Sequence, residues 1–377
     1  MLGLRDMRRI GIIGAGNIGT ALAADLAQRH CVKLYSSRPF EFSDKVVYKD
    51  SAGDMSFDSH IEIVSDKYAD VVCGVDIVFV CLPTYLIKIA AEHIASALTA
   101  PVPICFVPGA GGVEFLAKRL ADMRCPIVGL DRVPYVARVI EYGKSVLASK
   151  KSKTRIAVMR NTQSSLLDDI SFILDMPATR IRNFLSVSLT PTLHISRLYD
   201  LYGSMIHPER VENDPLFYGE WRDSASSICF ELDNELHSVC EALLQFGINT
   251  SEVVPYAIHY EAPSVCDLTL KLRSIQSLSK IHGPVVRRRN EFFLDINSRY
   301  FTESFPYRLA LVKGLADLAG VKVPLSDKVL SWYSKIAGKE YFVNGRFCGK
   351  DTIECSMPQN FGICDIEKLL SYYSENI

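Results

Sequence analysis

The stretch Arg9-Ile10-Gly11-Ile12-Ile13-Gly14-Ala15-Gly16-Asn17-Ile18-Gly19-Thr20 decides the fold of this chain. The apolar run over residues 10–13 predicts a buried strand, and the helical period after the loop predicts a helix. Gly14 permits the tight turn, Gly16 lets backbone N–H groups approach a pyrophosphate, and Gly19 lets helix and strand pack closely. This order of strand, loop and helix predicts a dinucleotide-binding βαβ unit, because the N-terminus of a helix attracts phosphate.

The strand that follows the predicted helix indicates which nicotinamide cofactor binds. It ends in Ser36-Ser37-Arg38, where NAD-specific domains usually offer an acid to the ribose hydroxyls. Two hydroxyls and a guanidinium suit a 2′-phosphate better, because arginine binds phosphate bidentately. The sequence therefore favours NADP(H), and an arginine that is merely solvated would leave NAD(H) open. The residues expected to bind the cofactor in these two segments are Gly14, Gly16, Asn17, Ile18, Gly19, Ser36, Ser37 and Arg38.

Short apolar runs alternate with helical stretches as far as residue 160. The later runs carry almost no charge, as expected for parallel strands covered by helices on both faces. They are Ile77–Leu82, Ile104–Val107, Pro126–Leu130 and Ile156–Met159. The pattern predicts an α/β Rossmann domain, a doubly wound parallel sheet, over residues 1–187. Leu82 and Pro83 stand at the end of one predicted strand, and we expect them to contact the cofactor.

The second half of the chain has helical periodicity. Within residues 223–246, apolar side chains recur at spacings of three and four, which is typical of an amphipathic helix. Two further helices are expected over residues 306–319 and 326–337, and each of the three is followed by a glycine that can end it. We therefore expect a mainly α-helical substrate domain over residues 188–377.

Composition excludes several classes of protein. The 377 residues carry 42 Lys+Arg and 43 Asp+Glu, and this balance removes the electrostatic case for nucleic acid or an anionic membrane. We expect neither a signal peptide nor a membrane span. The eleven cysteines form no C-x-x-C pair and are expected to be reduced thiols of a cytoplasmic protein. No metal site is expected, because the Cys and His residues lack ligand spacing.

Three parts of the chain resemble motifs of one enzyme family. Tyr202-Gly203-Ser204-Met205-Ile206-His207-Pro208 is similar to the segment that carries the catalytic histidine of the octopine/nopaline (opine) dehydrogenases. Ser298-Arg299-Tyr300-Phe301-Thr302-Glu303-Ser304-Phe305-Pro306-Tyr307 resembles that family's Arg-Tyr-x-Thr-Glu-Asp signature. Pro108–Phe115 and Val133–Arg138 match the family's Rossmann half in type and spacing. The resemblance spans roughly residues 8–340.

The resemblance implies a reaction and the residues that perform it. Members of the family use NAD(P)H to reduce the imine formed between an α-keto acid and the amino group of an amino acid or amine. Arg299 matches the family's arginine, and its planar fork suits the carboxylate of the keto acid. His207 is implied as the acid–base group, since imidazole titrates near neutrality. The implied partners are these small molecules, with no nucleic acid and no membrane, and a homodimer is left open.

One residue departs from the family signature. The family carries an aspartate that orients and charges the histidine, and this chain has Ser304 at that position, beside Glu303. Without an acid partner, the imidazolium is less stabilised and its tautomer is less defined. Glu303 is the candidate catalytic acid that could replace the aspartate, although a displacement of one residue usually points a side chain elsewhere.

Other functions stay open at this point. A 2-keto or 3-hydroxy acid dehydrogenase of ketopantoate-reductase type would need the same cofactor loop but no amine. A nucleotide-binding relative with a decayed dyad is suggested by Ser304. His259-Tyr260-Glu261 is a rival acid–base cluster, for which we favour a structural role, and the basic run Arg287-Arg288-Arg289 is expected on the solvated surface.

Overall fold

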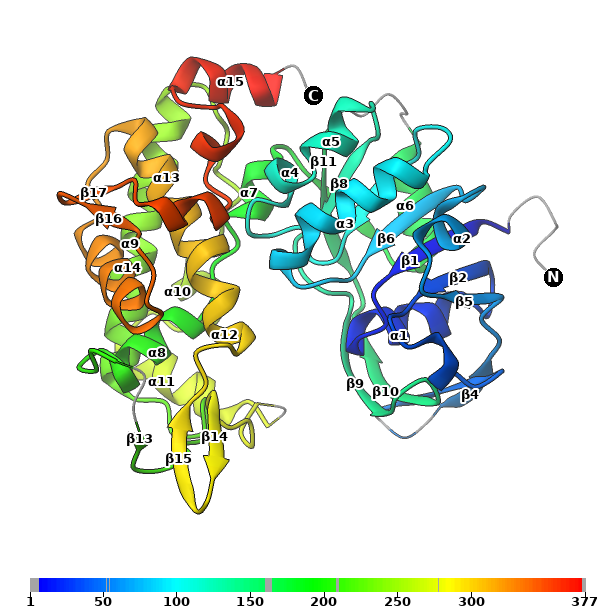
Figure 1. Ribbon diagram of the computed structural model, residues 1–377, viewed down its shortest axis with the longest axis horizontal. Coiled ribbons are helices and arrows are strands. Elements are labelled where there is room, and N and C mark those ends of the chain that lie inside the picture. Colours follow the sequence, from blue (N-terminus) through cyan, green and yellow to red (C-terminus); the bar gives the residue numbers. More distant parts are fainter. Residues whose placement is uncertain are drawn as a thin grey trace. The chain divides into compact units, whose positions relative to one another are not determined.

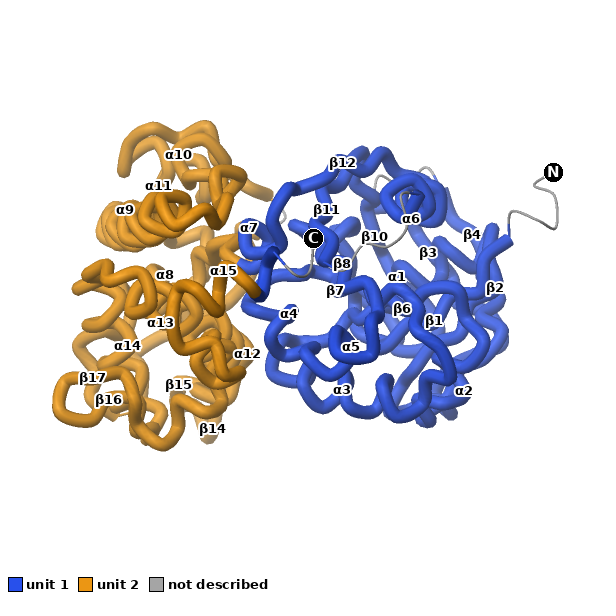
Figure 2. The backbone as a smooth tube through the Cα atoms, turned by 90° about the horizontal axis from the view of Figure 1, so that it is seen from above, with its two compact units in different colours: residues 1–188, 372–377 blue, residues 189–371 orange. Residues whose placement is uncertain are grey.

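The computed structural model describes residues 7–51, 53, 55–159, 165–207, 210–276 and 278–374. The chain divides into two compact units (Figure 2), residues 1–188 with 372–377 and residues 189–371. The sequence predicts a boundary between residues 187 and 188, and it carries no signal that the last residues return to the first unit. The chain therefore crosses between the units twice.

An eight-stranded sheet forms the centre of the first unit, in the order β12-β11-β8-β7-β6-β1-β2-β5 (Figure 1). Its strands are β1 (Arg9–Ile13), β2 (Cys31–Tyr35), β5 (Ile63–Ser65), β6 (Ile77–Val80), β7 (Ile104–Phe106), β8 (Ile127–Leu130), β11 (Thr154–Met159) and β12 (Ala178–Ile181). β1 pairs in parallel with β2 and β6, so that Ile10 lies between Val32 and Ile77. All residues of β6 and β8 are buried, as expected for strands covered on both faces. The predicted Rossmann-like α/β sheet is confirmed.

The direction of one strand of this sheet differs from the prediction. β11 pairs antiparallel with β8, with Ala157 opposite Gly129. The cause is the connection, because β8 is followed by two further strands, β9 (Tyr135–Glu141) and β10 (Ser145–Lys150), which form an antiparallel pair. A parallel return needs a crossover connection, usually a helix on one face of the sheet. The expectation of a parallel strand at residues 156–159 is therefore wrong in direction.

Helices cover both faces of the sheet. They are α1 (Asn17–Leu26), α2 (Tyr68–Val72), α3 (Thr84–Ala97), α4 (Val113–Leu116), α5 (Lys118–Asp122), α6 (Leu166–Leu174) and α7 (Phe184–Ser188). Figure 2 shows α2, α3 and α5 on one side and α1 and α6 on the other. A second sheet, in the order β4 (Ser56–Ser59), β3 (Val46–Asp50), β10, β9, packs against α1. The small buried face of α1, with Ala21 and Ala24, lets the helix lie close to Ile10 and Ile12 of β1.

The second unit is mainly helical, as the sequence predicts. Its helices are α8 (His194–Tyr202), α9 (Asp223–Gln245), α10 (Tyr256–His259), α11 (Val265–Ser274), α12 (Arg299–Thr302), α13 (Ala310–Ala319), α14 (Pro324–Ile336) and α15 (Ile366–Ser374). A small sheet has the order β13 (Arg210–Val211), β15 (Glu291–Leu294), β14 (Val285–Arg288), and β16 (Phe342–Val343) pairs with β17 (Arg346–Phe347). The core is rich in stacked aromatic rings, such as Phe305 on Tyr333 with centroids 4.3 Å apart.

The three helices predicted in this half all form, one of them in two parts. The helix predicted over residues 223–246 is α9, and the helix predicted over residues 326–337 is α14. The helix predicted over residues 306–319 begins with a π-helical turn, η2 (Phe305–Leu309), which leads into α13. Pro306 lies in this first turn, where its missing N–H costs little.

The basic run expected on the surface can now be placed. The run Arg287-Arg288-Arg289 lies at the end of β14 and in the turn to β15, and all three residues are exposed, as expected. Within the described ranges, no helix is both long enough and apolar enough to cross a membrane.

Candidate active site

The glycine loop between β1 and α1 has the geometry that the sequence predicts. Gly14 adopts a φ of +109°, which favours glycine, and a Cβ there would lie 2.6 Å from the carbonyl oxygen of Cys81. A Cβ on Gly19 would lie 1.7 Å from the carbonyl oxygen of Gly14, so strand and helix meet without a side chain between them. A Cβ on Gly16 would meet nothing within 4 Å. The open space at Gly16 is where a ligand can approach the backbone.

A cavity of about 400 Å³ lies beside this loop and is lined by the ends of β1, β2 and β6. Its lining contains six of the residues predicted to bind the cofactor, namely Gly14, Gly16, Ser36, Ser37, Leu82 and Pro83. The remaining lining residues are Ala15, Tyr35, Tyr68, Cys81, Leu86, Ile89 and Tyr142. The cavity therefore occupies the carboxyl end of a parallel sheet, the usual ligand position in open α/β folds.

Four predicted cofactor residues lie outside this lining. The side chain of Asn17 accepts a hydrogen bond from the backbone N–H of Val139 at 2.9 Å, and Ile18 packs against the core. Gly19 serves the close contact between helix and strand. Arg38 is held at two points, because its guanidinium lies 3.9 Å from the centroid of the Tyr142 ring and donates to Glu41 at 3.1 Å.

Two tyrosines of the cavity carry no local signal in the sequence. Tyr142 reaches the cavity from the turn between β9 and β10, and its hydroxyl lies 2.8 Å from Oγ of Ser36. Tyr68 stacks on Tyr35, with ring centroids 4.2 Å apart. Since both contacts join residues that are far apart along the chain, no periodicity or motif could have indicated them.

A second cluster of polar side chains lies in the second unit, around His194 at the start of α8. Nδ1 of His194 lies 3.3 Å from Oγ of the buried Ser304. The imidazole packs edge-on against Tyr300 and Phe217, with centroids 4.5 Å and 5.9 Å away. Aromatic rings thus cover the imidazole while a single hydroxyl contacts one of its nitrogens.

The surroundings of His194 favour the neutral imidazole. Burial is the main cause that lowers the pKa of His194, to about 3, and the positive charges of Arg299 and Arg308 lower it further. Ser304 carries no charge that could offset them. At neutral pH the imidazole is therefore unprotonated and can accept a proton.

The residues that the sequence predicts to be catalytic lie on two segments of the second unit. His207 is exposed and lies in a bend after α8, next to Pro208, which is outside the described residues. Arg299 is the exposed first residue of α12, and Glu303 is the half-buried residue that ends this helix. Ser304 contacts His194, so the histidine beside the signature segment is not the one that the sequence favours. The role predicted for His207 stays a prediction.

His194 could not be chosen from its surroundings in the sequence. It is one of eight histidines, and the residues around it form an ordinary helical start. Only its spatial contact with Ser304, 110 positions further along the chain, distinguishes it.

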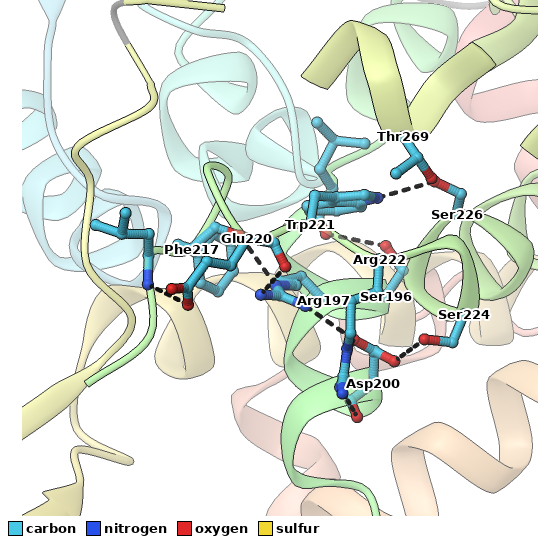
Figure 3. A network of polar contacts seen from close by, with 12 residues as sticks. Ser196, Arg197, Asp200, Phe217, Glu220, Trp221, Arg222, Ser224, Ser226 and Thr269 are labelled. Carbon is cyan, nitrogen blue, oxygen red and sulfur yellow. Dashed lines mark hydrogen bonds and ion pairs between the residues drawn. The ribbon is translucent and has the colours of Figure 1, made fainter. Parts of the chain in front are cut away.

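A buried arginine holds the helix that carries His194. Figure 3 shows Arg197, one turn further along α8, donating to the carbonyl oxygens of Phe217 and Glu220 at 2.9 and 2.7 Å and to Asp200 at 2.9 Å. Asp200 also accepts hydrogen bonds from Arg222 and Ser224. Because Arg197 is buried and Asp200 is its ion-pair partner, removing Asp200 would leave a buried positive charge uncompensated. This network fixes Phe217, whose ring packs against His194.

The remaining candidates fit structural roles. The ring of His259 packs edge-on against Tyr260, with centroids 4.7 Å apart, and the exposed Glu261 pairs with Lys271. Over the described part of the chain, no group of three or more His, Cys, Asp or Glu residues is arranged to hold a metal ion.

The fold and these sites define a class: an NAD(P)-dependent oxidoreductase with a Rossmann-like unit and a helical unit. Residues 180–337 match the family of the NAD/NADP octopine/nopaline dehydrogenase, alpha-helical domain, and residues 9–104 match the NADP oxidoreductase, coenzyme F420-dependent family. Tauropine dehydrogenase of Arabella iricolor is 26% identical over 329 residues, covering 79% of this chain and 80% of the relative. Octopine dehydrogenase of Pecten maximus is 24% identical over 320 residues, covering 80% and 79%. The chain is therefore similar to the opine dehydrogenases over about four fifths of its length.

Solved structures show the same fold. Octopine dehydrogenase in complex with NADH and agmatine superposes with a TM-score of 0.84 and 21% sequence identity, covering 97% of this chain and 98% of the other. Structures of octopine dehydrogenase with NADH and L-arginine or pyruvate give the same score. The expected order of a Rossmann-like unit followed by a helical unit is thereby confirmed.

Two glycines of the loop, Gly16 and Gly19, should respond differently when each is replaced by alanine. Gly19→Ala should lower the melting temperature strongly, because the new Cβ collides with backbone that cannot move away. Gly16→Ala should leave the melting temperature within about 2 °C, since the Cβ points into open space, and should weaken dinucleotide binding about tenfold or more. Calorimetry of unfolding and titration with NADPH measure the two effects. Equal dinucleotide affinity in Gly16→Ala and wild type would contradict the assignment of the cavity.

Proposed function

We propose that this protein reduces the imine that forms between an α-keto acid and the amino group of an amino acid or amine, with NADPH as the preferred cofactor. The contact between His194 and Ser304, close to the charge of Arg299, carries the proposal. A plain keto acid reductase needs a cation for the carboxylate, a hydride donor and a group that gives a proton to the developing alkoxide. Condensation with an amine also needs a group that removes a proton from the ammonium, and a neutral imidazole is suited to this.

In our proposal the arginines bind the carboxylate of the keto acid. Arg299 is exposed at the start of α12, so its guanidinium is accessible to a substrate. Arg308 lies on η2, and its Nη1 donates to the carbonyl oxygen of Thr190 at 3.1 Å, which fixes its position. A bound carboxylate would offset both positive charges beside His194, and this raises the affinity of the imidazole for a proton. Keto acid binding thereby prepares the histidine for the next step.

We assign proton transfer to His194. The neutral imidazole takes a proton from the ammonium of the amine substrate, which frees the nitrogen lone pair to attack the keto carbon. The resulting imidazolium returns that proton to the hydroxyl of the carbinolamine, which leaves as water and gives the iminium. Ser304 holds Nδ1 of His194 and so leaves Nε2 for this exchange. When bound, NADPH supplies the hydride that completes the reduction.

The residues that line the cavity beside the glycine loop fit a dinucleotide. Gly16 presents open space at the N-terminus of α1, and Ser36, Ser37 and Arg38 follow the end of β2. Arg38 supports our preference for NADP(H), because its ion pair with Glu41 is exposed and a 2′-phosphate can compete for it. The complexes of octopine dehydrogenase with NADH show that the fold also accommodates the cofactor without this phosphate. NAD(H) is therefore the second candidate.

All eleven cysteines are free thiols in the structure. This supports our proposal that the protein works in the reducing cytoplasm, where disulfides are rare.

The histidine assignment is tested with two variants. His194→Ala should lower kcat/KM for amine-dependent NADPH oxidation by about 100-fold or more, because a positioned acid–base group contributes about that factor. His207→Ala, which removes an exposed histidine from the same unit, should stay within about twofold of wild type. The assay follows NADPH with pyruvate or 2-oxoglutarate, each with and without pooled amino acids. A severe loss in His207→Ala alone would restore the sequence prediction, and oxidation without any amine would identify a 2-keto acid dehydrogenase.

Ser304→Asp tests the electrostatics of His194. A carboxylate beside Nδ1 stabilises the imidazolium, so the pKa of His194 should rise above its value of about 3 in wild type. The proton-accepting form is lost as the pH falls through this pKa, so the acid limb of the kcat/KM profile should move to higher pH. Ser304→Ala, the matched control, removes the hydrogen bond without adding charge and should leave the acid limb in place. An unchanged acid limb in Ser304→Asp would show that another group titrates.

Arg38→Ala tests the cofactor preference. The variant should lose about tenfold to 100-fold in kcat/KM for NADPH, because charge-assisted hydrogen bonds contribute roughly 1.5–3 kcal/mol. Its kcat/KM for NADH should change by less than about threefold, since NADH has no 2′-phosphate. Arg119→Ala removes an arginine that pairs with Glu92 on α3 and serves as the control. Equal losses with both cofactors would reject the role of Arg38 in recognising the phosphate.

A further inference from the structure

The two crossings of the chain between its units have a common attachment in the first unit. The first crossing follows Ser188, the last residue of α7, and the second precedes Tyr372 near the end of α15 (Figure 2). Next to each crossing, a residue of the first unit contacts Glu114, on the short helix α4. Glu114 itself plays no part in the proposed chemistry.

The carboxylate of Glu114 accepts hydrogen bonds from residues next to both crossings. Oγ of Ser188 donates to Oε2 of Glu114 at 2.5 Å, and the hydroxyl of Tyr373 donates to Oε1 at 2.8 Å. Ser188 is the last residue before the first crossing, and Tyr373 is the second residue after the return. The two oxygens of a single side chain are thus divided between the two connections.

The segment around Glu114 reinforces both attachments. The backbone N–H of Gly111 donates to the carbonyl oxygen of Ser188 at 2.9 Å. The hydroxyl of Tyr372 donates to the backbone carbonyl oxygen of Glu114 at 2.9 Å, and its ring stacks on Phe115 at 5.3 Å. Each connection is therefore fixed at more than one atom on a few residues of the first unit.

The environment of Glu114 shows why the two hydroxyls matter. The side chain is fully buried, and burial raises its pKa to about 7, while the hydrogen bonds from Ser188 and Tyr373 oppose this rise. A buried carboxylate is costly unless donors satisfy it, and here the side-chain donors are hydroxyls and not a cation. Moving either connection away from Glu114 would leave a buried oxygen without its donor, so each attachment resists separation.

We propose that Glu114 is a hinge anchor, which fixes both connections to the first unit and confines the pivot to the residues just beyond them. A body attached at one point can turn about three axes, whereas a body attached at two points turns only about the line through them. With Ser188 and Tyr373 both held, movement of residues 189–371 reduces to rotation about one axis through the two crossings. The inference does not rest on the proposed reaction.

The test is hydrogen–deuterium exchange of the full-length protein, followed at residues 184–190 and 369–374. Ser188→Ala should speed exchange about tenfold in the first segment only, and Tyr373→Phe in the second segment only. Glu114→Gln keeps the volume but can accept through only one oxygen, so it should speed exchange in the segment whose hydroxyl loses its acceptor. Tyr341→Phe removes a tyrosine hydroxyl that donates to Glu354 within the second unit, and it serves as the matched control.

The pattern across the variants decides the inference. Unchanged exchange in both segments of Glu114→Gln would overturn it, as would the same increase in Tyr341→Phe, which would indicate general loosening. If Glu114→Gln does not fold, Ser188→Ala and Tyr373→Phe decide alone: separate effects support the anchor, and no effect in either segment overturns it. Enzyme activity is not part of the readout, so failure of the proposed function would leave this result unaffected.

Discussion

The contact between Gly19 and the carbonyl oxygen of Gly14 is the constraint on which the first unit depends. Since a Cβ would lie only 1.7 Å from that oxygen, α1 can begin directly over the end of β1 only when residue 19 has no side chain. The helix then supports the hairpin of β9 and β10, because Asn17 accepts from Val139 and Asp25 accepts from Tyr135. The turn of that hairpin carries Tyr142 to Ser36, so the glycine contact at one end of the cavity also positions its opposite wall.

The second unit depends on a different interaction, the buried pairing of Arg197 with Asp200. Both residues lie on α8, which begins with His194, and Arg197 joins this helix to the segment that carries Phe217 through its carbonyl oxygen. A buried guanidinium is stable only where its donors are satisfied. The hydrogen bonds of Arg197 therefore fix the position of the residues around His194. Among the described residues no acid pairs with the imidazole, and its lowered pKa keeps it neutral at neutral pH.

Three titratable groups illustrate how surroundings decide charge in this protein. Arg197 keeps its charge because an acid pairs with it, and His194 remains neutral because two arginines act on it and Ser304 offers only a hydroxyl. Glu114 lies between these cases, with its pKa raised to about 7 by burial and opposed by two hydroxyl donors. The aspartate of the family signature would have placed His194 in the first category. The serine of this chain leaves the imidazole without that negative charge.

The sequence by itself determined the elements whose causes are local. The glycine loop, the uncharged strands and the period of α9 depend on residues within one or two turns of each other, so β1, α1, β6 and α9 could all be predicted. The family resemblance located the signature segment and Ser304. Only the tertiary structure decided that Ser304 contacts His194, that Tyr142 joins Ser36, and that β11 runs antiparallel. Each of these joins residues separated by many positions, and their contact depends on how complete elements pack, which no local pattern of side chains encodes.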